Sequence, residues 1–522
     1  MKTQVLPREP ALDPRRRKLV LAAMCFALAT VVSAVSSLNV ALPDLARDVH
    51  TTQTQLQWIV DAYAVVFAGL LLLAGALGDA FGRRPLLLGG LVVFSTAAAS
   101  ALFVDSPSGL IAVRAVMGLG AAAIMPATLS IITNVFPPDE RDRAVAIWAG
   151  VAGGSALLGL LVSGALLEAF AWDSIFVFSA VLGVIALIAG VRLAPNSTAE
   201  GTRLDVTGGV ISALGLGILV YAIIEGPERG WTDSLTLGAF VLAILLLSVF
   251  VVWELRREQP LLDPRLFRLR GFGAGTLSIT VQFFAFFGFI FVMLQYVQFV
   301  LGYSPFVAGA ALAPMAVMVM ALSPRVPKLL ERFGPAWIAP IGLLLMACGF
   351  VVLSTAGQGT SYWLLFSGLV PLGAGMALAT TPATTAIVSS LPQAKQGVAS
   401  AVNDLAREVG GALGIAVLGS ALTGRYQSGV ADATAHLPAQ LSGRAEDALP
   451  AALAIADRLG PQGAGLASSA QAAFVDGLGL AFLIAAASVA AAALFVFWRA
   501  PRESTVAQRG GGTVRRAQLE GE

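Results

Sequence analysis

The most telling absence in this sequence is charge. Charged residues make up 12% of its 522 residues, whereas a soluble protein carries about 25%. Hydrophobic residues account for 57%, and the mean hydropathy is +0.81. A chain this long with so little charge is predicted to cross a membrane many times. The formal net charge of +2 gives no reason to expect a nucleic acid as partner.

Cysteine and histidine are equally scarce. Cys25 and Cys348 both fall inside apolar runs, which excludes a disulfide framework. His50 and His436 lie far apart in polar segments, so no metal site is expected. The chain also lacks a Gly-x-x-x-x-Gly-Lys-Ser/Thr loop and a polar domain large enough for an ATPase. Lysine is rare beside arginine, which favours a GC-rich, bacterial source.

Long apolar runs dominate what remains. A membrane helix needs about 20 apolar residues, and backbone polar groups in lipid must be satisfied internally. We therefore predict an all-α polytopic membrane protein with fourteen transmembrane helices. Their ranges are 19–43, 55–78, 86–104, 109–134, 143–168, 174–193, 206–225, 234–253, 272–298, 306–323, 336–355, 361–390, 397–423 and 474–498.

The basic residues predict the orientation. Lysine and arginine gather in alternate segments, and cytoplasmic loops are the ones enriched in them. When the N-terminus is placed in the cytoplasm, most of these basic residues lie on the cytoplasmic side. We therefore predict a protein of the plasma membrane with both termini in the cytoplasm. The outer segments then hold Arg47, Arg229, Arg425, Arg444 and Arg458.

Two short matches indicate an internal repeat. Asp79–Gly82 aligns with Glu331–Gly334, and Pro126–Thr128 aligns with Pro382–Thr384 at a similar offset. We predict two six-helix bundles with two structural linker helices, the seventh and eighth, inserted between them, as in transporters built from parallel repeats. The predicted units are a cytoplasmic tail 1–18, a first bundle 19–195, a linker 196–258, a second bundle 259–500 with an extracellular segment 424–473, and a cytoplasmic tail 501–522. Within 424–473, residues 445–459 are predicted to form an amphipathic helix.

Several motifs resemble a known family. The run "GALGDAFGRRP" (75–85), between helices 2 and 3, resembles the signature of the major facilitator superfamily, and "LIAVRAVMGLGAA" (110–122) is similar to its helix 4 motif. Three further runs resemble the 14-helix drug:proton antiporter family. They are "LNVALP" (38–43), "LDVTGGVISALGLGILVYAIIEGPERGW" (204–231) and "GVASAVNDLAREVGGALG" (397–414). The resemblance covers about residues 20 to 500. It implies proton-driven export of drugs or antibiotics.

Two positions depart from that family. Ala34 stands where helix 1 usually carries an aspartate, which implies that helix 1 takes no part in proton coupling. The helix 5 motif Gly-Pro-x-x-Gly-Gly is replaced by Gly159–Gly164 without its proline. Glu168 and Asp79 sit at helix ends, so Asp61 is the only acid deep within the first five helices.

Asp61 is therefore the first candidate for proton coupling. It lies near the outer end of helix 2, at about the depth of Arg114 in helix 4. An arginine cannot be deprotonated in practice, so Arg114 must pair with a carboxylate or snorkel to the interface. Two alternatives stay open for Asp61: a permanent ion pair with Arg114, or an exchange of that pair for a proton.

A second charged group lies in helix 13. Asp404, Arg407 and Glu408 share one helix face. They form either a self-neutralising cluster that anchors packing or a site for a proton or a substrate cation, with Glu408 ahead of Asp404 as the titrating group.

The loop motif after helix 2 is a candidate conformational latch. Gly82 permits a tight turn, Gly75 begins the motif, and Arg83 and Arg84 face the cytoplasmic headgroups. A membrane anchor explains the arginines but not Asp79. We therefore expect Asp79 to stabilise the outward-facing state.

The candidates for the substrate cavity are amides, aromatics and a methionine. Such groups suit a promiscuous apolar pocket, although most of the phenylalanines in 280–299 are expected to face lipid or neighbouring helices. The candidates are Asn39, Tyr63, Gln282, Phe286, Met293, Gln295 and Asn403.

We thus expect a proton-coupled exporter, not an enzyme, that moves amphiphilic drugs or antibiotics by alternating access. Its partners are the small amphiphilic substrate, protons and the lipid bilayer. It is expected to be a monomer, with the proton gradient in place of any cofactor. The alternatives are a dedicated exporter of one endogenous metabolite or antibiotic, and a non-transporting membrane sensor or enzyme.

Overall fold

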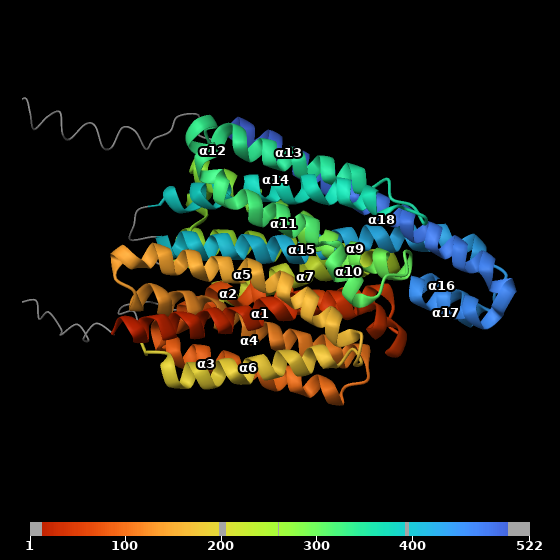
Figure 1. Cartoon of the computed structure of the whole chain (residues 1–522), viewed down its shortest axis with the longest axis horizontal. Coiled ribbons are helices and arrows are strands. Elements are labelled where there is room, and N and C mark those ends of the chain that lie inside the picture. The colour runs from red at the N-terminus through yellow and green to blue at the C-terminus, as the bar shows by residue number, and fades with distance from the viewer. Residues whose placement is uncertain (1–12, 198–204, 259, 392–395, 500–522) are drawn as a thin grey trace, which may run out of the picture.

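The computed structural model describes residues 13–197, 205–258, 260–391 and 396–499, and in these ranges the regular structure is helical, without a strand (Figure 1). The predicted tails lie mostly outside the described residues. The exception is Asp13 to Lys18, of which Pro14 to Lys18 are helical and continue into the first apolar run.

The first half of the chain forms six long helices in the predicted order. A short 3₁₀ turn, Ala101–Phe103, follows the third. The helices are α1 (Pro14–Asp48), α2 (Gln53–Phe81), α3 (Arg83–Ser100), α4 (Pro107–Val135), α5 (Pro138–Leu167) and α6 (Ser174–Leu193).

Two linker helices and the second half follow. The linker consists of α7 (Val206–Arg229) and α8 (Ser234–Arg256), and a 3₁₀ turn, Pro264–Arg268, leads into the second half. That half contains α9 (Arg270–Phe299), α10 (Pro305–Ala311), α11 (Ala313–Leu322), α12 (Val326–Phe333), α13 (Pro335–Leu353), α14 (Tyr362–Ser389), α15 (Gln396–Thr434), α16 (Ala439–Asp447), α17 (Leu449–Leu459) and α18 (Ala464–Arg499).

Side chains cap the N-termini of several of these helices. Thr52 and Gln55 form a reciprocal capping box at the start of α2, which satisfies two backbone donors that no helical carbonyl can reach. Ser106, Asp205 and Ser361 cap α4, α7 and α14 with side-chain oxygens. Each cap lets a helix begin next to an apolar run without leaving bare N–H groups at the membrane surface.

Two predicted elements need correction. The helix expected over 306–323 is broken into α10 and α11, because Pro314 lacks the N–H that a continuous helix would require. The single helix expected over 445–459 is two, α16 and α17, separated by the extended Ala448. Pro450 stands in the first turn of α17, where a proline is tolerated.

The outer segment predicted as 424–473 is largely helical. Helix α15 continues to Thr434, and α18 begins at Ala464, so both helices extend into it. Only the part between them, with α16 and α17, forms a separate structure.

Thirteen of the described helical segments are long and apolar enough to cross a membrane, with α10 to α12 counted as one span and α17 to α18 as another. Helix α5 adds a shorter apolar stretch, Gly154–Leu167, so the count is roughly consistent with the predicted fourteen. In Figure 1 the helices run side by side along the long axis of the molecule. We call the end where α1 begins and α18 ends the terminal end, and the opposite end, which carries α16 and α17, the cap end.

The internal repeat is visible in the backbone. Gly82 has φ +116° and ψ 134°, and Gly334, its counterpart in the repeat, has φ +77° and ψ 156°. Both glycines end a helix at the terminal end and start the next one immediately. A positive φ at this point favours glycine, so the two halves share the same turn.

Candidate functional site

The two halves touch through polar contacts at the cap end. Gln57 of α2 donates from Nε2 to Oγ1 of Thr423 in α15 at 3.0 Å. Gln298 of α9 donates to the carbonyl of Val40 in α1 at 3.2 Å. All four residues lie in the part of their helices nearest the cap end.

Helices α5 and α10 make a third contact of this kind. The backbone N–H of Phe306 donates to Oε1 of Glu168 at 3.3 Å. Gly164 lies so close that an added Cβ would stand 2.8 Å from the Cα of Phe306. We call the boundary between the two halves the seam. At the cap end the seam is closed, because the backbones of the two halves are in direct contact there, which only small residues permit.

Asp61 lies in the seam next to these contacts. It is fully buried, and neither carboxylate oxygen has a hydrogen-bond partner. On α2, residues three or four apart share a face, so Asp61 shares its face with Gln57 and Val65. Gln57 contacts α15, and Val65 belongs to an apolar cluster formed with α7 and α15. Asp61 therefore faces the second half.

Arg114 lies on the other side of α2. Its Nε donates to the carbonyl of Ile59 at 3.1 Å, and its guanidinium lies 4.4 Å from the ring centre of Tyr63. The side chain is 1% exposed, so it does not snorkel to the interface.

The ion pair expected between Asp61 and Arg114 is absent from the ion pairs of the described residues. The reason is the helical period. Ile59 and Tyr63 are four residues apart on one face, whereas Asp61, midway between them, points about 200° away. In this conformation Asp61 therefore points away from the face of α2 that Arg114 contacts.

The charged group of α15 also differs from a simple ion cluster. Asp404 is buried, whereas Arg407 and Glu408 are partly buried, and none of the ion pairs among the described residues joins them. The Arg407 guanidinium lies 5.2 Å from the ring centre of Phe283 instead. Asn403, beside them, accepts at Oδ1 from Thr384 at 3.2 Å.

Glu408 is directed toward the same seam as Asp61. It precedes Ala412 and Ala416 at four-residue intervals, and these two alanines pack in the cluster that includes Ala64 of α2. The seam between α2 and α15 thus carries one carboxylate from each half, at different levels along the two helices, because Gln57, one turn from Asp61, meets Thr423, about four turns from Glu408.

The loop motif after α2 makes its contacts within the first half. Arg83 forms an ion pair with Asp79, four residues earlier, at 2.9 Å, and donates to the carbonyl of Ser130 at 3.2 Å. Arg84 donates to the carbonyl of Val191 in α6 at 2.7 Å. In this conformation Asp79 therefore forms its ion pair within the first half, and its role as a latch in the outward-facing state stays a prediction. At Gly75, an added Cβ would make only an ordinary contact with Pro126.

The predicted cavity residues lie mostly inside the protein. Asn39, Tyr63, Gln282, Met293, Gln295 and Asn403 are buried, and Phe286 is partly buried. Gln282 accepts from Thr380 at 2.7 Å. The side-chain carbonyl oxygens of Asn39 and Gln295 are buried without a partner, so each retains an unused acceptor on a helix that lines the seam.

Helix α7, predicted from sequence as a structural linker helix, also joins the two halves. Trp58 of α2 donates to Glu225 of α7 at 3.0 Å, and Ser420 of α15 donates to the carbonyl of Ile223 at 2.7 Å. Helix α7 therefore binds to both halves at the cap end. The carboxylate at Glu225 was the available signal, because an acid near the end of an apolar run needs a partner.

Comparison with known proteins agrees with this architecture. Residues 20–415 match the family model of the Major Facilitator Superfamily. The multidrug efflux pump LfrA of Mycolicibacterium smegmatis is 35% identical, over 92% of this chain and 96% of its own length. The tetracenomycin C resistance and export protein of Streptomyces glaucescens is 33% identical over 91% of each chain. The methyl viologen resistance protein SmvA of Salmonella typhimurium is 32% identical over 88% of this chain and 93% of its own.

Solved structures share the fold at lower identity. A bacterial homologue of the human lysosomal transporter Spinster, inward-facing and unoccupied, aligns with a TM-score of 0.62 at 19% identity, over 94% of this chain and 98% of that one. An auto-inhibited peptide transporter of the POT family gives a TM-score of 0.62 at 18% identity, over 94% and 97% of the two chains.

Proposed function

Because the chain belongs to the Major Facilitator Superfamily, a family of transporters and not of enzymes, we propose that it exports amphiphilic drugs or antibiotics from the cytoplasm in exchange for protons. The observation that carries this proposal is Asp61, an unpartnered carboxyl group buried in the seam between the two halves.

The orientation follows from the basic residues. The positive-inside rule makes the terminal end cytoplasmic, with both termini inside. The cap end is then extracellular, and its closed contacts make this conformation inward-facing. Cargo from the cytoplasm would enter between the halves at the terminal end.

Proton coupling follows from the environment of Asp61. An ionised carboxylate without a partner in an apolar seam is costly, so the seam closes readily over Asp61 only when the carboxyl group carries a proton. Loss of that proton toward the cytoplasm favours opening at the cap end. A proton from outside then neutralises Asp61 and allows the seam to close again. Glu408, on the facing stripe of α15, is the second candidate carrier.

The cargo class rests on the relatives and on the buried residues near the seam. Those relatives are named as a multidrug efflux pump, a tetracenomycin C resistance and export protein, and a methyl viologen resistance protein. In this chain, aromatic rings and amides such as Phe286 and Gln295 supply apolar contact with a few hydrogen-bonding groups, which suits varied amphiphiles. No cofactor is needed, because the proton gradient supplies the energy. We expect a monomer in the bacterial plasma membrane.

The test is uptake of a cationic dye into inverted vesicles that contain the protein, because the outer face of such vesicles is the cytoplasmic face. The uptake is driven by an imposed pH gradient with the acidic side inside. We expect dye movement that stops when the gradient is collapsed. Asp61→Asn should abolish gradient-driven movement, whereas Asp105→Asn, an exposed acid in the loop before α4, should match the native protein. If Asp61→Asn keeps its full pH dependence, the coupling role is wrong. If one metabolite moves and no dye or drug does, the protein is a dedicated exporter.

A further inference from the structure

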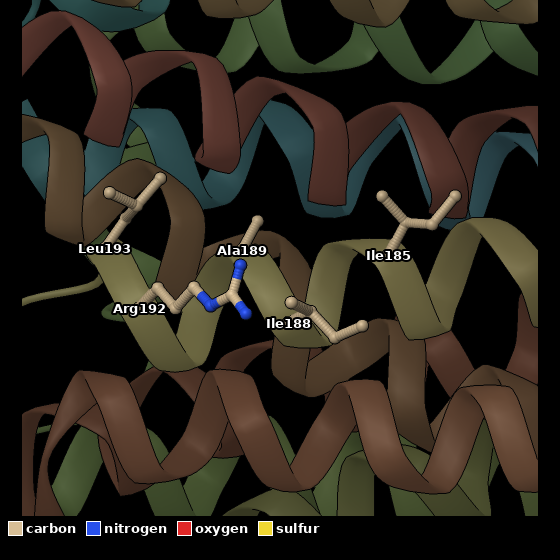
Figure 2. A pocket seen from close by; sticks show the side chains of 5 residues that line it. All are labelled: Ile185, Ile188, Ala189, Arg192 and Leu193. Carbon is tan, nitrogen blue, oxygen red and sulfur yellow. The ribbon is translucent and has the colours of Figure 1, made fainter.

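A hollow lies on the outer face of α6, near the terminal end. It has a volume of about 340 Å³ and is lined by Ile185, Ile188, Ala189, Arg192 and Leu193. Figure 2 shows the five side chains along the helix, with the Arg192 guanidinium beside Ala189 and Ile188. Nothing in the proposed transport cycle uses this hollow.

The wall of the hollow is hydrocarbon that faces outward. Ile185 and Ile188 are each 48% exposed, and Val181 and Val184 of the same helix are 50% and 46% exposed. On a helix that spans a membrane, such side chains contact the acyl chains of lipids. The hollow is therefore continuous with the lipid-facing surface of the first half.

Arg192 stands at the end of this apolar strip. It lies in the last turn of α6, where the helix reaches the membrane surface, and it is exposed. It forms none of the ion pairs found among the described residues. A favourable contact with the helix C-terminus would explain an arginine here, but not the hollow beneath it.

The end of α6 also supports the loop motif. Arg84 donates to the carbonyl of Val191, next to Arg192, and its Nε is buried without a partner. The backbone N–H of Arg83 donates to the carbonyl of Ser197 at 3.0 Å. A second guanidinium, from the motif itself, thus lies against the residue that precedes Arg192.

We propose that this hollow binds one acyl chain of an anionic phospholipid, with the lipid phosphate held by Arg192. A guanidinium binds phosphate through parallel hydrogen bonds, and the apolar slot directly beside it accepts the chain to which that phosphate is attached. Arg84 adds positive potential at the same place. The bound lipid stabilises the contact of α3 and α6 on which the loop motif rests.

The test is native mass spectrometry of the purified, delipidated full chain, titrated with phosphatidylglycerol or with phosphatidylcholine of the same acyl chains. We expect retained phosphatidylglycerol adducts on the native protein, and roughly fivefold weaker retention for Arg192→Gln, since one arginine near a membrane surface contributes about that factor. Arg332→Gln is the matched control, because Arg332 is an exposed arginine in the last turn of α12 at the same end. It should retain the lipid like the native protein.

Two further measurements separate the parts of the site. Ala189→Trp fills the hollow without changing charge and should also weaken retention, whereas Arg192→Lys should preserve most of it. Soluble glycerol phosphate should not raise the melting temperature of the native protein. Equal retention by Arg192→Gln and Arg332→Gln, equal binding of the two lipids, or stabilisation by glycerol phosphate alone would each overturn the proposal.

Discussion

Gly164 offers the sharpest perturbation of the closed seam. A Cβ at this position in α5 would stand 2.8 Å from the Cα of Phe306 and 3.0 Å from the carbonyl oxygen of Pro305. Both neighbours are backbone atoms, so no side chain can rotate out of the way. Overpacking of this kind costs about 1–3 kcal/mol. Since this contact exists only while the cap end is closed, Gly164→Ala should lower the ratio of closed to open molecules roughly 5- to 150-fold.

The assay is the distance between spin labels on the two halves at the cap end. Phe170 and Trp363 are suitable label positions, since they are 63% and 74% exposed, after Cys25 and Cys348 are replaced by serine. Gly154→Ala is the matched control, because the same helix leaves nothing within 4 Å of an added Cβ there. Distance distributions that are identical for Gly164→Ala and Gly154→Ala would refute the assignment of this contact to the gate.

Three other changes test separate parts of the account. Gly82→Ala should cost about 1–3 kcal/mol, because Gly82 has φ +116°, and it should lower the melting temperature, whereas Gly89→Ala, with open space around its Cβ, should not. Arg114→Gln should reduce both melting temperature and efflux, since it leaves Tyr63 and the Ile59 carbonyl without their buried partner; unchanged stability would contradict that packing role. Burial, and then the neighbouring Glu228 and Glu446, raise the pKa of Asp447 in α16. Docking of α16 should therefore weaken as the pH rises from the usual aspartate range through that raised pKa, and hydrogen-exchange protection of α16 in Asp447→Asn should lose this dependence.

The helices and their repeat could be predicted because hydropathy and turn chemistry are local properties. Apolar runs gave most of the helix bounds to within a few residues, although α15 continues to Thr434 and α18 begins at Ala464, beyond the runs that predict them. Gly82 and Gly334 marked the turn that the two halves share. The break before Pro314 was missed, because a proline in a membrane helix often bends the helix without ending it.

The site could be predicted only in part. The sequence indicates that Asp61 and Arg114 are buried charges at about the same depth in the membrane. Depth alone does not say whether Arg114 contacts the face of α2 that carries Asp61. The helical period separates them, and the partner side of Asp61 is α15, which lies far away in the sequence. Gln57 and Thr423 gave no signal of their own, since their pairing depends on how the two halves are docked.

The central claim is that substrate leaves as protons enter. The direct measurement uses proteoliposomes that contain the purified protein and a trapped pH indicator. No pH gradient is imposed at the start. A cationic dye, moved by the protein down its own gradient, should drive protons in the opposite direction in the native protein and in Asp105→Asn. Asp61→Asn should bind dye without proton movement. Dye transport by the native protein with no opposite proton flux would contradict the account.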